Sequence, residues 1–416
     1  MASASFAPLR HRSFALALGS NFISSTGTWM QSVALGVYLT VTTHNAVWLG
    51  LLTACAWLPA LVGSPLGGVM ADRYSRQRWI QFNNLAQAST ASALAVAELT
   101  HHLSAPLACY LAIAEGFCSS VSWSAWQSLL PDLVDRDEVL AAISLGSAQF
   151  NLGRIIGPVL AAVTLAVGNP GWCFVANALS FIIVVIAFSF VHSPPRPRVA
   201  SRLALVGDTL VGMRAAWGSR GCRNAIVGVG TVALFVSPFI TLVPAMAIEV
   251  LHSGKVGTSW LVTAQGVGAV IGALTLPGVA RRTSRIAVLR GSIAAMALME
   301  ALYAYAPTLL LSALALVVLG GAYVGALTGL NTTVQLHAPT TERSRILSLY
   351  VLSLSLFYPL GALVQATLAH HLGVRLVTLG AALAFGALVG LLSFFRPRYW
   401  HEMATAPHHL NVSVAD

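Results

Sequence analysis

The sequence predicts an all-α integral membrane protein with twelve transmembrane helices in two six-helix pseudo-repeats. Composition is the first indication, because 56% of the 416 residues are hydrophobic and only 9% are charged, whereas soluble domains carry about a quarter charged residues. Spacing is the second, because apolar segments of roughly 20 to 28 residues recur along the chain, each long enough to cross a hydrocarbon core about 30 Å thick. The third is a weak similarity between the two halves.

The apolar segments cover most of the chain and are separated by short polar loops. The first, from about residue 14 to residue 41, is too long for the core of a signal peptide and is expected to stay in the mature protein. The twelve predicted spans centre near Val33, Leu58, Ala88, Cys118, Leu152, Ile182, Val236, Val267, Ala295, Leu319, Leu354 and Ala384.

The net charge of +10 is distributed in the way that membrane topology demands. Basic residues gather in alternate loops, whereas the opposite loops hold only Lys255 and Arg375. This asymmetry follows the positive-inside rule and predicts that both termini are cytoplasmic. It also argues against a nucleic-acid partner. The basic clusters are Arg10 and Arg12; Arg73, Arg76 and Arg78; Arg136; residues 196–223; Arg281, Arg282, Arg285 and Arg290; Arg343 and Arg345; and Arg396 and Arg398.

The longest interruption divides six spans from six. We predict an N-terminal six-helix bundle over residues 1–191, a cytoplasmic linker over 192–222, a C-terminal bundle over 223–398 and a cytoplasmic tail over 399–416. The linker is expected to hold an amphipathic helix at the membrane surface, or simply to tether the halves. Its apolar face comprises Leu203, Val206, Leu210, Met213 and Trp217.

The halves share a pattern where the fourth and tenth spans end. Gln127 and Pro131 of the first half correspond to Gln335 and Pro339 of the second. Parallel repeats with a binding site between them at the bilayer midplane are a transporter architecture.

The loop after the second span, GVMADRYSRQR at residues 68–78, resembles the signature loop of the major facilitator superfamily, although it differs at Met70, Ser75 and Gln77. The resemblance implies that Asp72 meets a helix N-terminus of the other half and a neighbouring arginine, and so locks one access state. A carboxylate in that position gains charge-assisted hydrogen bonds whose loss biases a conformational equilibrium. The predicted gate is Gly68, Asp72, Arg73, Arg76 and Arg78. After the eighth span the glycines and basic residues recur without an aspartate.

The fifth span resembles the antiporter motif of drug exporters and of exporters of the enterobactin-exporter type. It reads NLGRIIGPVLAA from residue 151, with alanines in place of the last two glycines. The motif residues are Asn151, Gly153, Arg154, Gly157 and Pro158. Small residues allow close helix approach and proline loosens a helix, so ordinary packing is the alternative interpretation.

Two charged residues fall at comparable predicted depths in the membrane. Arg154 costs roughly 2.5 to 3.5 kcal/mol near the bilayer centre and therefore needs a partner or an aqueous cavity. Glu115, in the fourth span, could form a structural ion pair with Arg154, or could break and remake that pair as a proton carrier. Glu300, in the ninth span, and Glu98 and Glu249, at span ends, are weaker candidates for a proton carrier, and the favoured interpretation is that they are solvated carboxylates near the interface.

By analogy with the family, the first, fourth, seventh and tenth spans line the substrate cavity. This assigns to it Gln31, Gln127, Asn331 and Gln335, with Phe235 and Tyr323 as apolar neighbours. Each polar residue could instead join two helices. A mostly uncharged cavity suits a small amphipathic organic compound.

Enzyme and metal signatures are missing from the sequence. Gly254-Lys255 is followed by Val256 and lacks the preceding glycine of a phosphate-binding loop. The histidine pairs at residues 101–102, 370–371 and 408–409 and the five cysteines lack metal-ligand spacing. We therefore expect no catalytic residue, no cofactor and no metal.

The predicted function is proton-coupled efflux of a drug, antibiotic or siderophore by alternating access. The expected partners are that substrate, protons and the lipid bilayer of a prokaryotic cytoplasmic (inner) membrane, with the protein monomeric and multi-pass. One proton crossing about 100 mV gains roughly 2.3 kcal/mol, enough for about a fifty-fold solute gradient. A proton-linked importer or facilitator is the first alternative, and a lipid flippase or membrane-embedded enzyme is the second.

Overall fold

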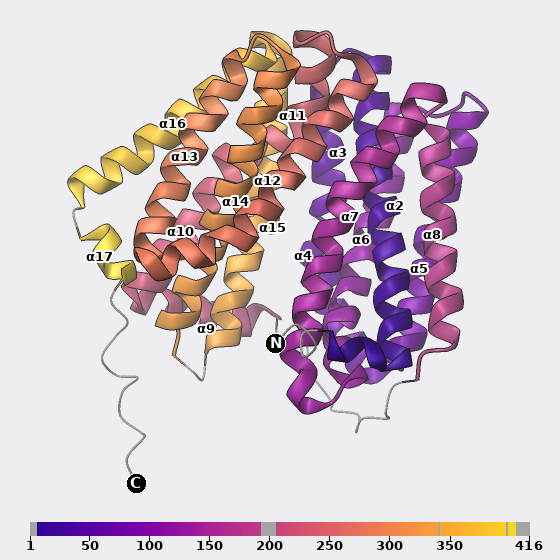
Figure 1. Cartoon of the computed structure of the whole chain (residues 1–416), viewed down its shortest axis with the longest axis horizontal. Coiled ribbons are helices and arrows are strands. Elements are labelled where there is room, and N and C mark those ends of the chain that lie inside the picture. Colours follow the sequence, from indigo (N-terminus) through magenta and orange to yellow (C-terminus); the bar gives the residue numbers. More distant parts are fainter. Residues whose placement is uncertain (1–5, 193–204, 340–341, 397, 405–416) are drawn as a thin grey trace. The chain divides into compact units, whose positions relative to one another are not determined.

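The computed structural model describes residues 6–192, 205–339, 342–396 and 398–404, with only the backbone described at residues 71, 72, 205–211 and 344. The described parts are helices joined by short connections (Figure 1). The chain forms two compact units: unit 1 comprises Met1–Leu203 and Val243–Thr263, and unit 2 comprises Ala204–Leu242 and Ala264–Asp416. Residues 243–263 thus group with unit 1, although the sequence suggested a division at residues 191 and 223.

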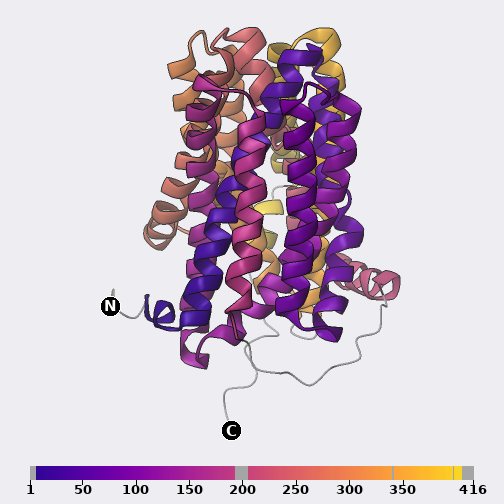
Figure 2. The same ribbon diagram turned by 90° about the vertical axis from the view of Figure 1, so that its right-hand side faces the viewer.

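Unit 1 is built on the central helix α2. This helix packs along α7 and α8, while α6 packs against α3, α4 and α5, and α5 also packs against α8. Figure 2 shows the short N-terminal turn leading into α2. The helices are α2 (Arg12–Thr43), α3 (Val47–Trp57), α4 (Ala60–Arg73), α5 (Arg76–Leu99), α6 (Ala105–Leu129), α7 (Val139–Val167) and α8 (Gly171–Ser189), with short turns η1 (Ala7–Arg10), η2 (Leu130–Leu133) and η3 (Arg136–Glu138).

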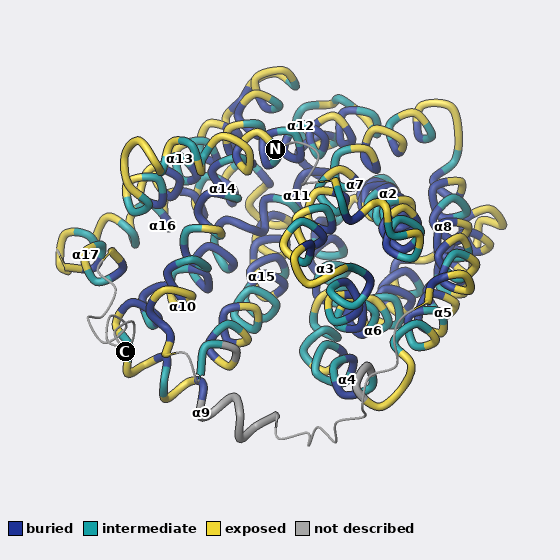
Figure 3. Tube along the Cα trace, turned by 60° about the horizontal axis from the view of Figure 1, so that its bottom comes forward, coloured by how far each residue is buried: buried dark blue, intermediate teal, exposed yellow. Residues whose placement is uncertain are grey.

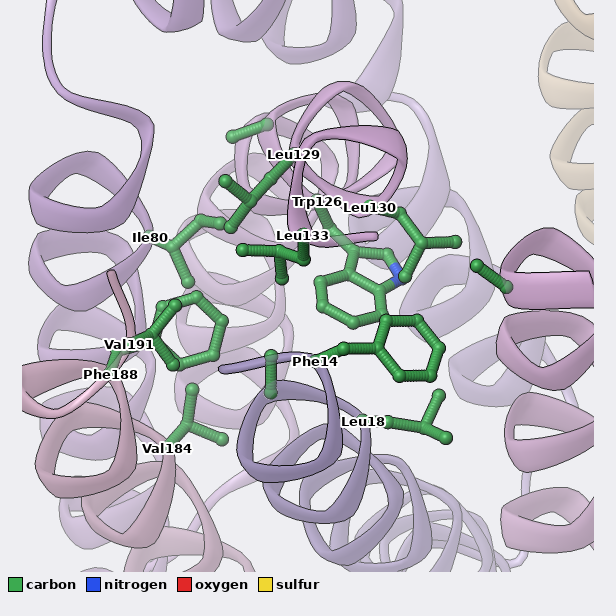
Figure 4. Packing of buried hydrophobic residues seen from close by; sticks show 13 residues of the cluster. Phe14, Leu18, Ile80, Trp126, Leu129, Leu130, Leu133, Val184, Phe188 and Val191 are labelled. Atoms are coloured by element: carbon green, nitrogen blue, oxygen red, sulfur yellow. The ribbon is translucent and has the colours of Figure 1, made fainter. Parts of the chain in front are cut away.

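Large apolar side chains close the end of unit 1 that carries the basic loops. Phe14 of α2, Ile80 of α5, Trp126 of α6 and Phe188 of α8 are buried in one cluster (Figure 4). Because apolar burial in a membrane helix bundle contributes mainly through close packing, this cluster fixes how the four helices meet beside the signature loop.

Glycines let α4 and α3 approach α6. A Cβ on Gly67 would lie 2.7 Å from the carbonyl oxygen of Val121, and one on Gly116 would lie 2.2 Å from that of Ala56. The second half uses the same device, since a Cβ on Gly268 would lie 1.8 Å from the carbonyl oxygen of Val317 and one on Gly272 would lie 2.6 Å from Cα of Gly321. In both halves, glycine lets the backbones of two neighbouring helices come into direct contact.

Unit 2 contains most of the C-terminal helices. In it α13 packs between α14 and α16, and α15 packs against α10. The C-terminal elements are α9 (Leu205–Gly218), α10 (Arg220–Thr231), the π-helical turn η4 (Val232–Val236), α11 (Phe239–Ala245), the π-helical turn η5 (Met246–Val250), α12 (Gly254–Arg282), α13 (Arg285–Tyr305), α14 (Leu309–His337), α15 (Arg343–Leu372), α16 (Val374–Phe395) and α17 (Tyr399–Ala404).

Within the described residues, ten helical stretches are long and apolar enough to cross a membrane. Two more helices are long enough but richer in polar residues: α2 has 32 residues and α5 has 24, or about 36 Å for the shorter one. Buried Asn83, Asn84 and Gln87 lower the apolar character of α5. The two helices α2 and α5 correspond in sequence to the first and third expected spans. Exposed positions follow the outward surfaces of helices such as α5 and α16 (Figure 3).

Two elements outside the spans were expected from the sequence. The linker contains α9, on which Met213 and Trp217 are 42% and 48% exposed. Leu203 lies outside the described residues, and the side chains of Val206 and Leu210 are not described.

The predicted tail begins with α17, which packs on unit 2 through two hydrogen bonds. Glu402 accepts one from Asn224 Nδ2 at 2.9 Å, and Arg285 Nη2 donates one to the carbonyl oxygen of Met403 at 2.7 Å.

Candidate functional site

A hydrogen-bonded chain joins three helices of unit 1 through Gln31. The Nε2 atom of this side chain on α2 donates to Glu115 Oε2 on α6 at 2.6 Å, and its Oε1 atom accepts from Asn177 Nδ2 on α8 at 3.0 Å. Ser180 Oγ in turn donates to Asn177 Oδ1 at 3.1 Å. Gln31 and Asn177 are buried, at 4% and 0% exposure. Gln31, predicted to line a cavity, therefore joins helices and holds the carboxylate of Glu115.

The absence of a side chain at Gly27 makes this chain possible. A Cβ on that residue of α2 would lie 2.7 Å from both Asn177 Oδ1 and Ser180 Oγ. Any larger residue would push α8 away and break the link between Gln31 and Asn177.

Arg154 of α7 lies on an aromatic surface. Its guanidinium carbon is 5.3 Å from the ring centroid of Trp29 on α2, a cation–π arrangement. Phe150 of α7 continues this surface, with ring centroids 6.2 Å from Trp29 and 5.5 Å from Trp123 of α6. The sequence analysis assigned no role to these three aromatic residues, because they lie on three helices and form no motif.

Glu115 and Arg154 meet α2 on nearly opposite faces. Trp29 and Gln31 are two residues apart, which corresponds to about 200° of rotation on an α-helix. Among the ion pairs of the described residues none joins Glu115 to Arg154; the carboxylate of Glu115 is hydrogen-bonded to Gln31. The expected pair is therefore not formed in this structure, because α2 presents a separate partner to each group.

The antiporter-like glycines bring α7 against α2. A Cβ on Gly157 would lie 2.6 Å from the carbonyl oxygen of Thr26, and one on Gly153 would lie 2.9 Å from Cβ of Ser25. Asn151 Nδ2 donates to the carbonyl oxygen of Ser147 one turn earlier, at 2.8 Å. The helix continues through Pro158. Gly153 and Gly157 thus allow α7 to pack closely against α2.

The signature loop is held by one of its arginines. Arg76 Nη1 donates to Asp132 Oδ2 at 2.5 Å and to the carbonyl oxygen of Ser128 at 2.9 Å. Both charged side chains are largely buried, at 15% and 5% exposure, while Arg73 and Arg78 are exposed. A Cβ on Gly68 would have no atom within 4 Å, so the close helix contact belongs to Gly67. The side chain of Asp72 lies outside the part of the chain that the structure describes.

The remaining predicted cavity residues have different surroundings. Tyr323 Oη is 2.9 Å from Ser237 Oγ, in a buried contact between α14 and the interrupted seventh span. Gln335 Nε2 donates to Asn331 Oδ1 at 2.6 Å on the same helix. Gln127 is exposed.

An interruption of the seventh span exposes backbone acceptors that Gln365 satisfies. Pro238 has no N–H, so the carbonyl of Leu234 lacks its usual helical donor. Gln365 Nε2 of α15 donates to that oxygen at 3.2 Å and to the carbonyl oxygen of Phe235 at 2.8 Å. Phe235, predicted to lie in the cavity, thus also takes part through its backbone carbonyl. Proline marks the missing donor in the sequence, but nothing marks a partner 130 residues away.

The N-terminal turn carries a charged cluster with metal-ligand residue types. Ligand atoms of His11, Asp135 and Glu138 lie within 4.8 Å of one another. Arg10 Nη2 is already 2.8 Å from Glu138 Oε1, and His11 Nε2 is 2.8 Å from Glu138 Oε2. A cation in the cluster would meet the charge of Arg10, so the arrangement fits an ion-pair tether between η1 and η3 better than a metal site.

The other acidic residues correct one expectation. Glu249 is exposed, as expected of a carboxylate near the interface. Glu98 and Glu300 are 7% and 0% exposed and are therefore not solvated. The reason is helical phase, which turns both side chains inward although both lie near helix ends.

Comparison with known proteins assigns the chain to a family. The model of a family described as transmembrane secretion effector, a group of major facilitator proteins, matches residues 3–414. The chain belongs to this family. The resemblance seen in the signature loop is thereby confirmed. Together with the apolar helices, membership shows that this major facilitator protein is an integral membrane transporter and not an enzyme.

Named relatives transport organic compounds. The chain is 28% identical over 400 residues to the enterobactin exporter EntS of Citrobacter koseri, covering 92% of this chain and 91% of that protein. It is 32% identical over 170 residues to the staphyloferrin A transporter of Staphylococcus aureus, where the match spans 40% of this chain and 42% of the relative. Both relatives are named as transport proteins, in agreement with the family.

Solved structures show the same fold. A crystal structure of the nucleoside transporter NupG aligns with a TM-score of 0.71 at 16% identity, covering 92% of this chain and 99% of that chain. A bacterial homologue of the human lysosomal transporter Spinster aligns with a TM-score of 0.73 at 14% identity, over 95% and 99% of the two chains. The predicted all-α membrane fold of the major facilitator type is confirmed.

Proposed function

We propose that this protein exports a small amphipathic organic compound of the siderophore class in exchange for protons. The observation that carries the proposal is the hydrogen bond from Gln31 to Glu115, which places an acid at the junction of α2, α6 and α8. The similarity to an enterobactin exporter over most of both chains supports the direction and the class of substrate.

Glu115 is the proposed proton carrier. Ionised, its carboxylate accepts a hydrogen bond from Gln31 Nε2 at 2.6 Å; protonated, it offers a donor and a weaker acceptor. Gln31 is held at its other end by Asn177. Loss or gain of the proton therefore changes the hydrogen bonding between α6 and the other two helices. Because the balance between the two access states depends on helix contacts, this change lets a proton shift that balance.

Arg154 and its aromatic neighbours are the proposed substrate contacts. A guanidinium group over Trp29, beside the rings of Phe150 and Trp123, offers positive charge and flat apolar area. This combination suits an organic anion that carries rings. The uncharged candidates Gln127, Asn331 and Gln335, with Tyr323 and Phe235, remain proposed contacts from the family analogy.

The signature loop is the proposed gate. The buried pair of Arg76 and Asp132 fixes the loop to the end of α6. We assign to Asp72 the role of closing the gate, and we place both termini in the cytoplasm because the basic loops lie on that side. The protein acts as a monomer in this scheme. An importer or facilitator is the alternative, since the same site could load from either side.

The test is proton movement in inverted vesicles with a preset pH gradient. Enterobactin and staphyloferrin A are added one at a time to wild type, Glu115→Gln and Glu249→Gln, the last being an exposed carboxylate as control. We expect a transported compound to collapse the gradient in wild type and in Glu249→Gln but not in Glu115→Gln. Equal collapse in all three would remove Glu115 from the proton path. No collapse by a compound that the protein binds would favour an importer or facilitator.

A further inference from the structure

Glu300 is a buried acid without a partner. It lies on α13, its side chain is 0% exposed, and neither carboxylate oxygen has a hydrogen-bond partner among the described residues. An ionised carboxylate is very unfavourable where neither a donor nor a cation reaches it. Burial of this kind therefore favours the neutral carboxylic acid over the carboxylate.

Glu300 lies on α13, which packs against α14 and α16 (Figure 1). Ser292 of α13 faces α14, where its Oγ would lie 2.4 Å from a Cβ on Gly325. Ala297 faces α16, where its Cβ would lie 3.5 Å from a Cβ on Gly386. At about 100° of rotation per residue, Glu300 lies between these two directions. Its carboxyl group thus points toward the interior of unit 2, where α14 and α16 both face it.

Three hydroxyl groups at the same depth are also buried and without partners among the described residues. Tyr303 of α13 is 1% exposed, Ser312 of α14 is 0% and Thr378 of α16 is 1%. Counting from the helix ends, all four groups of this Glu300 cluster lie within about 8 Å of the end of unit 2 opposite the basic loops, at 1.5 Å per residue. Arg375 Nη2 donates to the carbonyl oxygen of Ala306 at 3.3 Å, which confirms that α16 begins where α13 ends.

Few charged groups face the cluster. Arg375, in the first turn of α16, is engaged with the end of α13. The part of η4 that packs on α13 is apolar, and Phe239 covers Tyr303 with ring centroids 6.5 Å apart. Tyr305, at the end of α13, is exposed. The other titratable groups on the packed elements lie further along α14 or at the basic end: Tyr323, His337, Arg285, Arg290, Tyr399, His401 and Glu402. No cation from these elements neutralises Glu300 in the described structure.

An acid of which both oxygens are buried and lack a partner among the described residues is unusual for a purely structural core, because buried polar groups normally pair. We propose that Glu300 is a second proton-binding site of this transporter. Its carboxylic O–H bond breaks in the opposite access state, and the proton passes to water through the hydroxyls of Tyr303, Ser312 and Thr378. The carboxylate takes a proton back from water by the same route before the site closes.

This site rests on the proposed proton coupling but is distinct from Glu115. Glu115 lies in unit 1 and has a hydrogen-bond donor, whereas Glu300 lies in unit 2 and has none in the described structure. A proton site in each half would let both halves respond to the gradient. The hydroxyl groups serve as positioning residues, since they act through the proton of Glu300.

Infrared spectroscopy of the purified full-length protein in liposomes tests proton binding without any substrate. We expect wild type to show a carboxylic acid carbonyl band that Glu300→Gln removes and Glu249→Gln keeps. The band should shift in Tyr303→Phe, because that change removes a neighbouring hydroxyl. If Glu300→Gln removes a carboxylate band instead, Glu300 is ionised and the proposal is wrong. Should this variant fail to fold, the shift in Tyr303→Phe still assigns the wild-type band.

Transport separates a working proton site from an inert buried acid. For a compound that wild type exchanges for protons, Glu300→Gln should keep substrate counterflow yet accumulate the compound roughly fifty-fold less than wild type, the factor that one proton across about 100 mV supports. Glu300→Asp should retain part of the accumulation. Unchanged accumulation in Glu300→Gln would overturn the second site while leaving Glu115 in place. Accumulation that depends on the sodium gradient rather than on the pH gradient would also overturn the second site. If wild type itself shows no coupling between substrate and protons, the proposed function is wrong.

Discussion

Gln31 donates a hydrogen bond of 2.6 Å to Glu115 and at the same time accepts one of 3.0 Å from Asn177. One uncharged side chain on α2 thereby links an acid on α6 to an amide on α8. A hydrogen bond to a charged acceptor is stronger than one between neutral groups, so the protonation state of Glu115 decides how firmly α6 is held.

The first prediction concerns that link. Gln31→Leu should lower the free energy of unfolding by about 1 to 3 kcal/mol, because it leaves the buried Asn177 and the acceptor Glu115 without their partner. Thermal unfolding in detergent measures the change, with Gln335→Leu at an exposed position as control. In a double-mutant cycle with Glu115→Gln the effects should be non-additive. Additive effects would show that the two side chains do not interact in solution.

The second prediction concerns the seam between α7 and α2. Gly157→Val should abolish the folded protein, because even a Cβ would lie 2.6 Å from the backbone oxygen of Thr26. Gly68→Ala should fold normally, since a Cβ there meets no atom within 4 Å. Yield and size-exclusion profile in detergent report the outcome. A monodisperse Gly157→Val protein would mean that α7 does not lie against α2.

The third prediction concerns the interrupted seventh span. Gln365→Leu should destabilise the protein by about 1 to 3 kcal/mol, because the carbonyl groups of Leu234 and Phe235 lose their side-chain donor. Gln365→Glu cannot donate when ionised and should be at least as harmful. Gln127→Leu, at an exposed position, serves as the control in the same unfolding measurement. A neutral effect of Gln365→Leu would indicate that another donor reaches these carbonyls.

The fourth prediction concerns the anchor of the signature loop. Arg76→Gln and Asp132→Asn should each cost about 3 to 5 kcal/mol, because each removes one partner of a largely buried ion pair. The double variant should be less damaged than the sum of the two. Unfolding of the three proteins gives the coupling energy. A sum equal to the double variant would contradict a direct ion pair.

The fifth prediction concerns the proposed gate. Asp72→Asn should shift the balance between the two access states and reduce transport, because the neutral amide loses the charge-assisted hydrogen bonds of the carboxylate. Accessibility of cysteines introduced on both faces of the membrane measures the balance. Unchanged labelling on both faces, together with unchanged transport, would remove the gate role from Asp72.

The sequence by itself determined the membrane class, the apolar helices and the family. Low charge and long apolar runs leave few folds open in lipid, where the backbone must satisfy its hydrogen bonds internally. The signature loop and the glycine motif of the fifth span then pointed to the major facilitator superfamily. These features are local, so each can be seen within one stretch of residues.

Only the tertiary structure decided which side chains meet. Glu115 has Gln31 as its partner because Trp29 and Gln31 point from α2 in nearly opposite directions, so Arg154 and Glu115 reach different faces of that helix. Glu300, expected near solvent, is fully buried because the rotation of α13 turns it toward α14 and α16. Gln365 reaches backbone acceptors beside Pro238 although it lies on another helix. Partners of this kind depend on helix rotation and on contacts between distant segments, and hydropathy and local motifs predict neither.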